Sequence, residues 1–280
     1  MSPAHHSFWS SPRLRWAAAA IVVFNGFFPA LWILFTSLKT ETELVRKPIT
    51  WWPAEATWDN YVRAFSDQPL LHYLKNSFIV ATGATILSLI VAALAAYAIA
   101  RLQLKQRQLL LTCIVASSMF PLVTLLVPIF ETMRALGWLN TYMALILPYV
   151  VLNLPVCTLV LVSFFQSIPR DLENAAMIDG CTRLGALWHV VVPLATPGVF
   201  TAGILAFVNA WDEFLLALSL NSSPAVRTLP VGITLYQGEF TFPWPIISAA
   251  LIVAIVPIAI LIAVFQERVV GGLTQGGLKG

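Results

Sequence analysis

Side chains that could perform catalysis or hold a metal ion are few and scattered in this sequence. The four histidines and three cysteines show no metal-ligand or disulfide spacing: His5, His6, His72, His189, Cys113, Cys157 and Cys181. The sequence has no Gly-Lys-Ser/Thr phosphate loop, no His-Glu-x-x-His motif and no Gly-x-Ser-x-Gly motif. We therefore expect no enzymatic activity, no metal site and no bound cofactor in this chain.

The acids most suggestive of chemistry are two adjacent residues, Asp212 and Glu213, at the end of a long apolar run. Ionisable groups within membrane segments usually mark a solute or ion pathway, although acids at the interface also face water or headgroups. Other polar residues in or beside apolar runs could contact a solute or form hydrogen bonds between helices. The candidate pathway residues are Asn76, Tyr149, Asn153, Asn209, Asp212 and Glu213.

The elements that must position these residues are membrane helices. Of the 280 residues 59% are hydrophobic and only 10% are charged, whereas soluble domains are about a quarter charged. Six stretches without Asp, Glu, Lys or Arg are long enough to span a bilayer: 17–36, 77–100, 109–130, 141–165, 195–211 extending towards 218, and 246–265. Helices satisfy their backbone polar groups internally, so an all-α membrane protein with six spans is predicted.

The distribution of Lys and Arg predicts the orientation. The short turn 101–108 carries three basic residues and no acid, which places it and both termini in the cytoplasm. Residues 1–16 then form a cytoplasmic segment, 17–265 the membrane domain, and 266–280 a cytoplasmic glycine-rich tail. Loop 37–76 and loop 219–245 would lie outside, and three tryptophans suit the membrane–water boundary: Trp51, Trp52 and Trp58. The net charge of +3 gives no indication of a nucleic-acid partner.

Prolines lie within several of the predicted spans: Pro121, Pro128, Pro148, Pro155 and Pro257. Each removes a backbone donor, so kinks are expected. Kinked helices could line a solute cavity, or the neighbouring helices could absorb the kinks as packing features. Both interpretations stay open.

A polar segment, 167–193, interrupts the apolar runs and is predicted to form two short helices joined by a turn. Gly180 suits a left-handed helix end, and Thr182 suits the cap of the second helix. Apolar residues at helical spacing predict one apolar stripe: Leu184, Leu187, Trp188 and Val191. Pro193 is expected to end the second helix. Such a segment could be a surface anchor in the bilayer, but the small pair Ala175 and Ala176 favours a protein partner.

This segment resembles the coupling loop of the permease subunits of binding-protein-dependent ABC importers. Its pattern is Glu-Ala-Ala, three residues, Gly, nine residues and an apolar-x-Leu-Pro close. The matching residues are Ala175, Ala176, Gly180, either Val190 or Val191, and Pro193. The chain departs from the pattern at Asn174, where the carboxylate lies one place earlier at Glu173, and at Val192. Residues 76–77, 94–102, 210–214, 227–232 and 272–280 are similar to the maltose-type, carbohydrate-importing branch.

The resemblance implies a six-span permease that works with a second permease subunit, a cytoplasmic ATPase dimer and an extracytoplasmic binding protein, in a prokaryotic inner or plasma membrane. ATP and Mg²⁺ would be bound by the ATPase. Contact with the ATPase would involve Glu173, Asn174, Ala175, Ala176, Asp179, Gly180 and Pro193, and in the tail Gly276, Gly277 and Lys279. The solute would be a sugar or sugar derivative. A polyamine, an amino acid or a phosphate compound stays open, and so does an ion-coupled secondary transporter, although the spans carry no ionisable residue near their middle.

Overall fold

The computed structural model describes the backbone of residues 12–277 and the side chains of residues 14–265. Helices and turns make up this part of the chain, and no strand occurs within it. The chain divides into two compact units. One comprises Met1–Pro69 and Ile233–Ile255, and the other comprises Leu70–Gly232 and Val256–Gly280.

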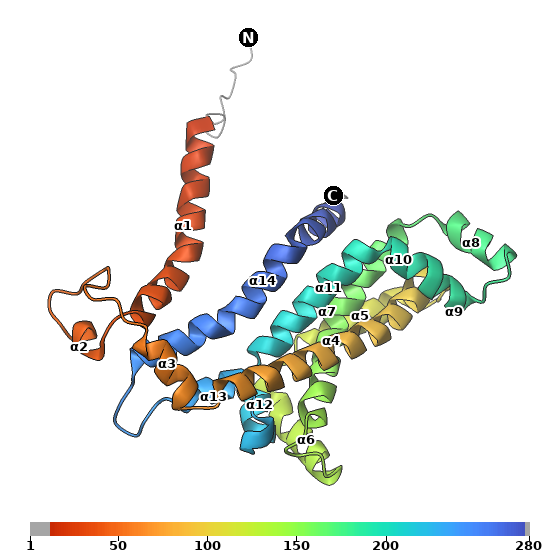
Figure 1. The fold of residues 1–280 in the computed structure, drawn as a ribbon. Helices are drawn as coiled ribbons and strands as arrows, with labels where there is room; N and C mark the ends of the chain where they lie inside the picture. Colours follow the sequence, from red (N-terminus) through yellow and green to blue (C-terminus); the bar gives the residue numbers. More distant parts are fainter. Residues whose placement is uncertain (1–11, 278–280) are drawn as a thin grey trace. The chain divides into compact units, whose positions relative to one another are not determined.

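The second unit is built around three long helices, α4 (Leu70–Arg101), α7 (Met143–Ser167) and α11 (Thr196–Asp212), which lie side by side (Figure 1). Small residues on α4 and α11 form much of the contact, among them Ala92, Ala96, Ala202 and Ala206. Such residues let helix backbones approach closely. At Gly198 an added Cβ would lie 2.3 Å from Cγ of Phe164, so α11 can approach α7 at this point only with glycine.

The remaining elements of this unit lie near the two ends of the three-helix core or beside it. Figure 1 shows α8 (Arg170–Ile178), α9 (Arg183–Ala186) and α10 (Val192–Leu194) at one end of the core. A π-helix, Leu187–Val191, joins α9 to α10. At the other end lie α6 (Leu122–Ala135) and α12 (Leu215–Leu220). The unit also contains α5 (Arg107–Ser118), the 3-10 turn Pro224–Val226 and α13 (Leu229–Thr234).

The first unit contains α1 (Pro12–Ser37), α2 (Glu41–Leu44), α3 (Asp59–Ser66) and the beginning of α14 (Trp244–Gly277). The segment between α1 and α4 is held by polar contacts. Asn60 Nδ2 donates to the carbonyls of Ser37 and Lys39 at 2.9 and 2.8 Å. Lys39 is buried, and its ammonium lies 5.3 Å from the ring centroid of Trp32. The predicted loop 37–76 is therefore folded: it contains α2 and α3, and it ends at residue 69, because α4 begins at Leu70.

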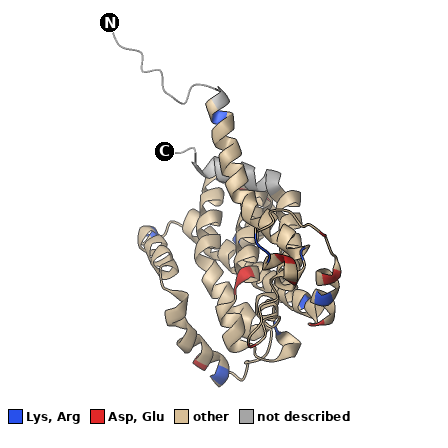
Figure 2. Ribbon diagram, turned by 90° about the vertical axis from the view of Figure 1, so that its left-hand side faces the viewer, with Lys and Arg blue, Asp and Glu red and all other residues tan. Residues whose placement is uncertain are grey.

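Charge follows the predicted pattern. Figure 2 shows most of the ribbon without charged residues, and its blue and red segments lie mainly at helix ends and connections. Four helices in the described part of the chain are long and apolar enough to cross a membrane: Leu14–Ser37, Leu70–Arg101, Met143–Ser167 and Trp244–Phe265. The membrane-protein class and the all-α fold are as predicted.

The third predicted span is not a straight helix, and the fifth predicted span begins at a bend. The pair α5 and α6 is bent by 91°, and the pair Arg183–Leu194 and Thr196–Asp212 is bent by 84°. Six spans result only if each bent pair is counted as one. At the first bend Pro121 takes an extended conformation, with ψ 129°, so this proline breaks the helix where only a kink was expected.

The continuous extension of the fifth span towards residue 218 was wrong. The helix α11 ends at Asp212, because Glu213 has an extended backbone with ψ 124°. A separate helix, α12, follows. Its first turn is capped by the Glu213 carboxylate, which accepts hydrogen bonds from the N–H groups of Leu216 and Ala217 at 2.9 and 3.1 Å.

Candidate functional site

The polar segment after α7 forms the predicted pair of short helices. Pro169 lies directly before α8, whose first turn carries Asp171 and Glu173, where negative charge complements the helix dipole. After α8 the chain turns at Gly180, whose φ is +97°. This value lies in a region that residues with a Cβ rarely adopt, so the predicted glycine turn is confirmed.

The second helix begins as predicted and continues differently. Thr182 Oγ1 accepts a hydrogen bond from the N–H of Gly185 at 3.1 Å, which confirms the cap. The helix then widens into the π-helix Leu187–Val191, where the Val192 N–H bonds to the Leu187 carbonyl. This shift of register accommodates Pro193 within α10. That helix ends at Leu194, one residue after the proline, with Ala195 as its C-cap, so the expected stop agrees with the structure to within one residue.

The π-helix also divides the predicted apolar stripe. Leu187 and Val191 are fully buried, whereas the exposed fraction is 58% for Leu184 and 40% for Trp188. A π-turn contains more residues than an α-turn, so residues three and four apart no longer share one face. The stripe therefore belongs partly to the core of the unit and partly to its surface.

The helix α8 has two different faces. Its outer face carries large apolar side chains without cover from the described residues: the exposed fraction is 46% for Leu172 and 85% for Ile178. Ala175 lies between them and is also exposed. On the inner face Glu173 is buried, with 7% of its surface exposed. The apolar outer face is the kind of surface that binds another protein.

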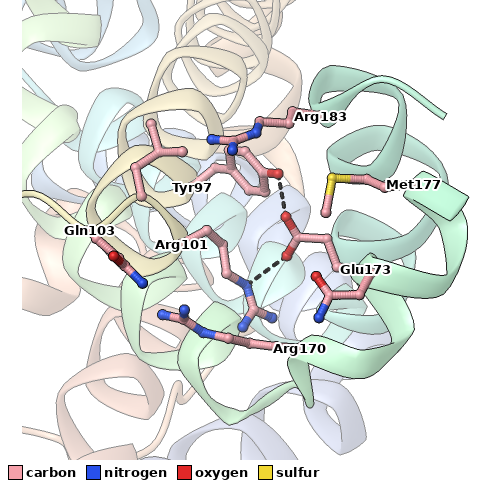
Figure 3. Close-up of a pocket in the computed structure, with 9 residues that line it drawn as sticks. Tyr97, Arg101, Gln103, Arg170, Glu173, Met177 and Arg183 are labelled. Atoms are coloured by element: carbon pink, nitrogen blue, oxygen red, sulfur yellow. Dashed lines mark hydrogen bonds and ion pairs between the residues drawn. The ribbon is translucent and has the colours of Figure 1, made fainter.

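The Glu173 carboxylate is held by two side chains of α4 (Figure 3). The Tyr97 hydroxyl donates a hydrogen bond to Oε1, and Arg101 Nε lies 3.1 Å from Oε2. Arg101 also donates from Nη2 to the carbonyl of Ile168 at 3.0 Å, at the C-terminal end of α7. One guanidinium thus joins the ends of α4 and α7 to α8.

A cavity of about 430 Å³ lies beside this cluster. Figure 3 shows Arg170 and Arg183 near the ion pair, on different sides of Arg101. The side chains that line the cavity include three arginines and one carboxylate, Glu173. Arg170 Nη2 donates to the carbonyl of Ala100 at 3.5 Å, which adds a second link to the end of α4.

The other residues predicted for coupling lie on or near the outer surface. Asn174, Ala175, Asp179, Gly180 and Pro193 are exposed, and Ala176 is partly buried. Helix α14 extends through Gly276 and Gly277, so the tail is helical up to that point. Lys279 lies outside the described residues.

Among the predicted pathway residues, Asn76 is fully buried and its amide is occupied. Nδ2 donates to the carbonyls of Ala225 and Arg227 at 3.1 and 2.9 Å, and Oδ1 accepts from the Tyr142 hydroxyl at 2.8 Å. These bonds join α4 to the connection between α12 and α13. A contact between Asn76 and a solute would require at least one of them to break.

Four further candidates form two pairs. The Tyr149 hydroxyl donates to Glu213 Oε2 at 2.6 Å, and Asn209 Nδ2 donates to Asn153 Oδ1 at 2.8 Å. Tyr149 and Asn153 are buried, whereas Asn209 is exposed on α11. Asp212, one turn further along α11, is also exposed. The structure therefore leaves Asn209 and Asp212 as the candidates with accessible polar groups.

Sequence reasoning did not identify Tyr97, Arg101, Leu172 or Ile178. Tyr97 and Arg101 are four residues apart at the end of an apolar run, a spacing that places both on one helix face. That signal was available, but their partner could not be named. Among the described residues no group of three or more His, Cys, Asp or Glu could hold a metal ion.

Comparison with known proteins places these features in a family. Residues 86–274 match the family described as "Binding-protein-dependent transport system inner membrane component". The chain is 71% identical to the "Sulfoquinovosyl glycerol transport system permease protein SmoH" of Agrobacterium fabrum, over 100% of this chain and 98% of that relative. It is 39% identical to the "Trehalose/maltose transport system permease protein MalG" of Thermococcus litoralis, over 90% of this chain and 91% of the relative.

A solved structure has the same fold. It is described as a bacterial ABC transporter involved in the import of the acidic polysaccharide alginate, and the two chains superpose with a TM-score of 0.77 at 20% identity. The superposition covers 95% of this chain and 99% of the other.

Proposed function

Because the chain belongs to the family of inner membrane components of binding-protein-dependent transport systems, it is an ABC importer permease and not an enzyme, and we propose that it translocates a sugar derivative. The observation that carries this proposal is the 71% identity, along the whole chain, to a relative named for sulfoquinovosyl glycerol transport. Other relatives are named for trehalose and maltose. The cargo proposed first is therefore a sulfonated sugar glycoside.

The exposed polar groups of α11 support a role in passing such a cargo. Asn209 and Asp212 lie one helical turn apart and are accessible. The Asn209 amide can donate hydrogen bonds to sugar hydroxyls, and the Asp212 carboxylate can accept them. A second permease subunit would close the pathway over this face. Tyr149, Asn153, Asn76 and Glu213 would position these groups through the hydrogen bonds described above.

Coupling to ATP is proposed to occur through residues 173–193. The outer face of α8 offers an exposed apolar surface, Leu172, Ala175 and Ile178, to a groove of a cytoplasmic ATPase subunit. Burying such side chains contributes about 25 cal/mol per Å² of apolar area. ATP and Mg²⁺ would be bound by the ATPase dimer. Closure of that dimer can change the permease only if the docked element differs in free energy between the two ATPase states.

The proposed function also requires a defined orientation of the chain in the membrane. Both termini and α8 would lie in the cytoplasm, and part of loop 219–245 would reach towards the extracytoplasmic binding protein. The short turn after Arg101, with Lys105 and Arg107, supports this orientation. The C-terminal residues after 265 would extend towards the ATPase dimer.

The proposed function is tested with the purified complex of this chain, its partner permease, the ATPase and the binding protein in liposomes. We expect ATP-dependent uptake of labelled sulfoquinovosyl glycerol, inhibited by an excess of the unlabelled compound and not by a polyamine or an amino acid. Uptake of a non-sugar solute instead of this compound would contradict the proposal that the cargo is a sugar derivative. Uptake by the chain alone, driven by an ion gradient without ATP, would overturn the mechanism.

A further inference from the structure

The ion pair between Arg101 and Glu173 differs from the other ion pairs of the described residues by its burial. The exposed fractions of its side chains are 4% and 9%, whereas those of the other pairs range from 44% to 67%. A buried ion pair is favourable only where hydrogen bonds satisfy its remaining polar atoms. Here Tyr97 donates to the Glu173 carboxylate and Arg101 Nη2 donates to the Ile168 carbonyl, whereas Arg101 Nε contacts Glu173 only as an ion pair, without hydrogen-bond geometry.

We infer that Arg101 and Tyr97 are positioning residues that make α8 and the end of α4 move as one body. The inference rests on the proposed function, because it describes how a displacement of α8 by the ATPase would reach the membrane helices. Glu173 then acts inside the chain and does not contact the ATPase. The ATPase contacts the opposite, apolar face of α8.

The connections of α8 show why such a link is needed. Along the chain α8 is joined to α7 through Ile168 and Pro169, and to α9 through the turn at Gly180. Its packing is mainly against α9 and the π-helix. Without a side-chain link to α4, the helix could pivot about these two connections. The guanidinium of Arg101 removes that freedom, because it binds α8 and the end of α7 at once.

The effect would extend through the membrane core. Helix α4 packs along α7 and α11, and Ala96 and Ala100 belong to the buried cluster that the three helices share with the π-helix. A closely packed core transmits a displacement, because its side chains have no free volume in which to absorb it. Movement of α8 would therefore shift α4, α7 and α11 together.

The test compares Glu173→Gln with Asp171→Asn in the full complex in liposomes. Both variants replace an acid of α8 by its amide, but Asp171 is exposed. Three quantities are measured: co-purification of the ATPase, ATP hydrolysis stimulated by the loaded binding protein, and solute taken up per ATP hydrolysed. For Glu173→Gln we expect normal co-purification, persistent hydrolysis and a fall of about tenfold in uptake per ATP. Asp171→Asn should match the wild type in all three.

Two outcomes of this comparison would overturn the inference. Normal uptake per ATP in Glu173→Gln would show that the link carries no movement. Loss of the ATPase from a correctly inserted Glu173→Gln permease would show that Glu173 is a contact with the ATPase. If the wild-type complex showed no ATP-driven uptake, the proposed function itself would be wrong. Failure of the inference and failure of the proposed function therefore give different results.

A second measurement keeps the test decisive if Glu173→Gln does not fold. Spin labels are placed at Asp171→Cys on α8 and Leu94→Cys on α4, where the exposed fraction is 41%, in a chain whose native cysteines are replaced. The distance between the labels should be equal in the nucleotide-free and ATP-bound complexes. A distance that changes between these states in the otherwise wild-type chain would overturn the inference.

Discussion

The hydroxyl of Tyr149 donates a hydrogen bond of 2.6 Å to Glu213, across the contact between α7 and the break that follows α11. The same carboxylate caps α12 through two backbone N–H groups. Glu213 is therefore a fixed part of the fold, in contrast to its exposed neighbour Asp212. Two adjacent acids thus have different surroundings and should respond differently to substitution.

Replacing Glu213 by Ala is expected to destabilise the permease by about 1–3 kcal/mol, because the buried Tyr149 hydroxyl and two helix N–H groups lose their acceptor. Thermal unfolding of the purified complex measures the change. Asp212→Ala is the matched control and should leave the unfolding temperature unchanged. Equal effects of the two substitutions would contradict this account of Glu213.

Gly180→Val is expected to abolish uptake while the chain still inserts in the membrane. The φ of +97° at this residue is strained for any residue with a Cβ, and the strain would distort the turn between α8 and α9. An added Cβ meets no atom within 4 Å, so the effect would come from the backbone and not from a clash. Gly180→Asn, which tolerates positive φ better, should retain more uptake. Normal uptake by Gly180→Val, with the variant present at normal abundance, would contradict the coupling role of this segment.

Gly198→Ala is expected to lower the stability of the membrane core, because the added Cβ would lie 2.3 Å from Cγ of Phe164. Overpacking of this kind costs about 1–3 kcal/mol. Gly26→Ala in α1 is the control, since no atom lies within 4 Å of its added Cβ. Unfolding in detergent measures both variants. If Gly198→Ala is as costly in a Phe164→Ala background, which lacks the clashing Cγ and Cδ2 atoms, as it is in the wild type, the clash is not its cause.

Ile178→Ser is expected to weaken the association with the ATPase by about tenfold or more, since a large exposed side chain of the docking face is lost. Co-purification of the ATPase at increasing dilution measures the change. Val45→Ser is the control, because its exposed fraction of 80% resembles the 85% of Ile178 but it lies between α1 and α4. Equal retention of the ATPase by both variants would place the docking surface elsewhere.

Stability of the segment between α1 and α4 should depend on acid pH through Glu43. Burial acts to raise the pKa of this carboxyl, but hydrogen bonds from Thr50 and the Ala54 N–H, with the charges of Lys39 and Arg46, bring the pKa below the ordinary 4.5. A carboxyl with a lowered folded-state pKa contributes stability above its ordinary pKa, and this stability is lost as the pH falls through the folded-state pKa.

Tryptophan fluorescence measures this transition, because Trp51 and Trp52 lie in the same segment. The transition should occur below pH 4.5 in the wild type. Glu43→Gln should remove it, whereas Glu55→Gln, an exposed neighbour, should retain it. A transition that persists unchanged in Glu43→Gln would assign it to another group.

The sequence by itself determined the features that depend only on residues close together along the chain. Long uncharged apolar runs predict membrane helices, because a backbone in lipid must satisfy its own hydrogen bonds. Gly180 and Thr182 predict a turn and a cap, because a positive φ and a free helix N–H are local requirements. The family pattern around residues 173–193 is also a continuous segment. The apolar helices, the turn and the cap agree with the structure, whereas the coupling role of residues 173–193 stays a prediction.

The tertiary structure alone decided which distant groups meet. Tyr97 and Glu173 are 76 positions apart, and Asn76 and Arg227 are 151 apart. Periodicity assigns a residue to a face of its own helix, but the partner of that face depends on the packing of several helices together. For this reason Glu173 was expected to contact another protein, and only the packing of α8 beside the end of α4 gave its carboxylate a partner within the chain.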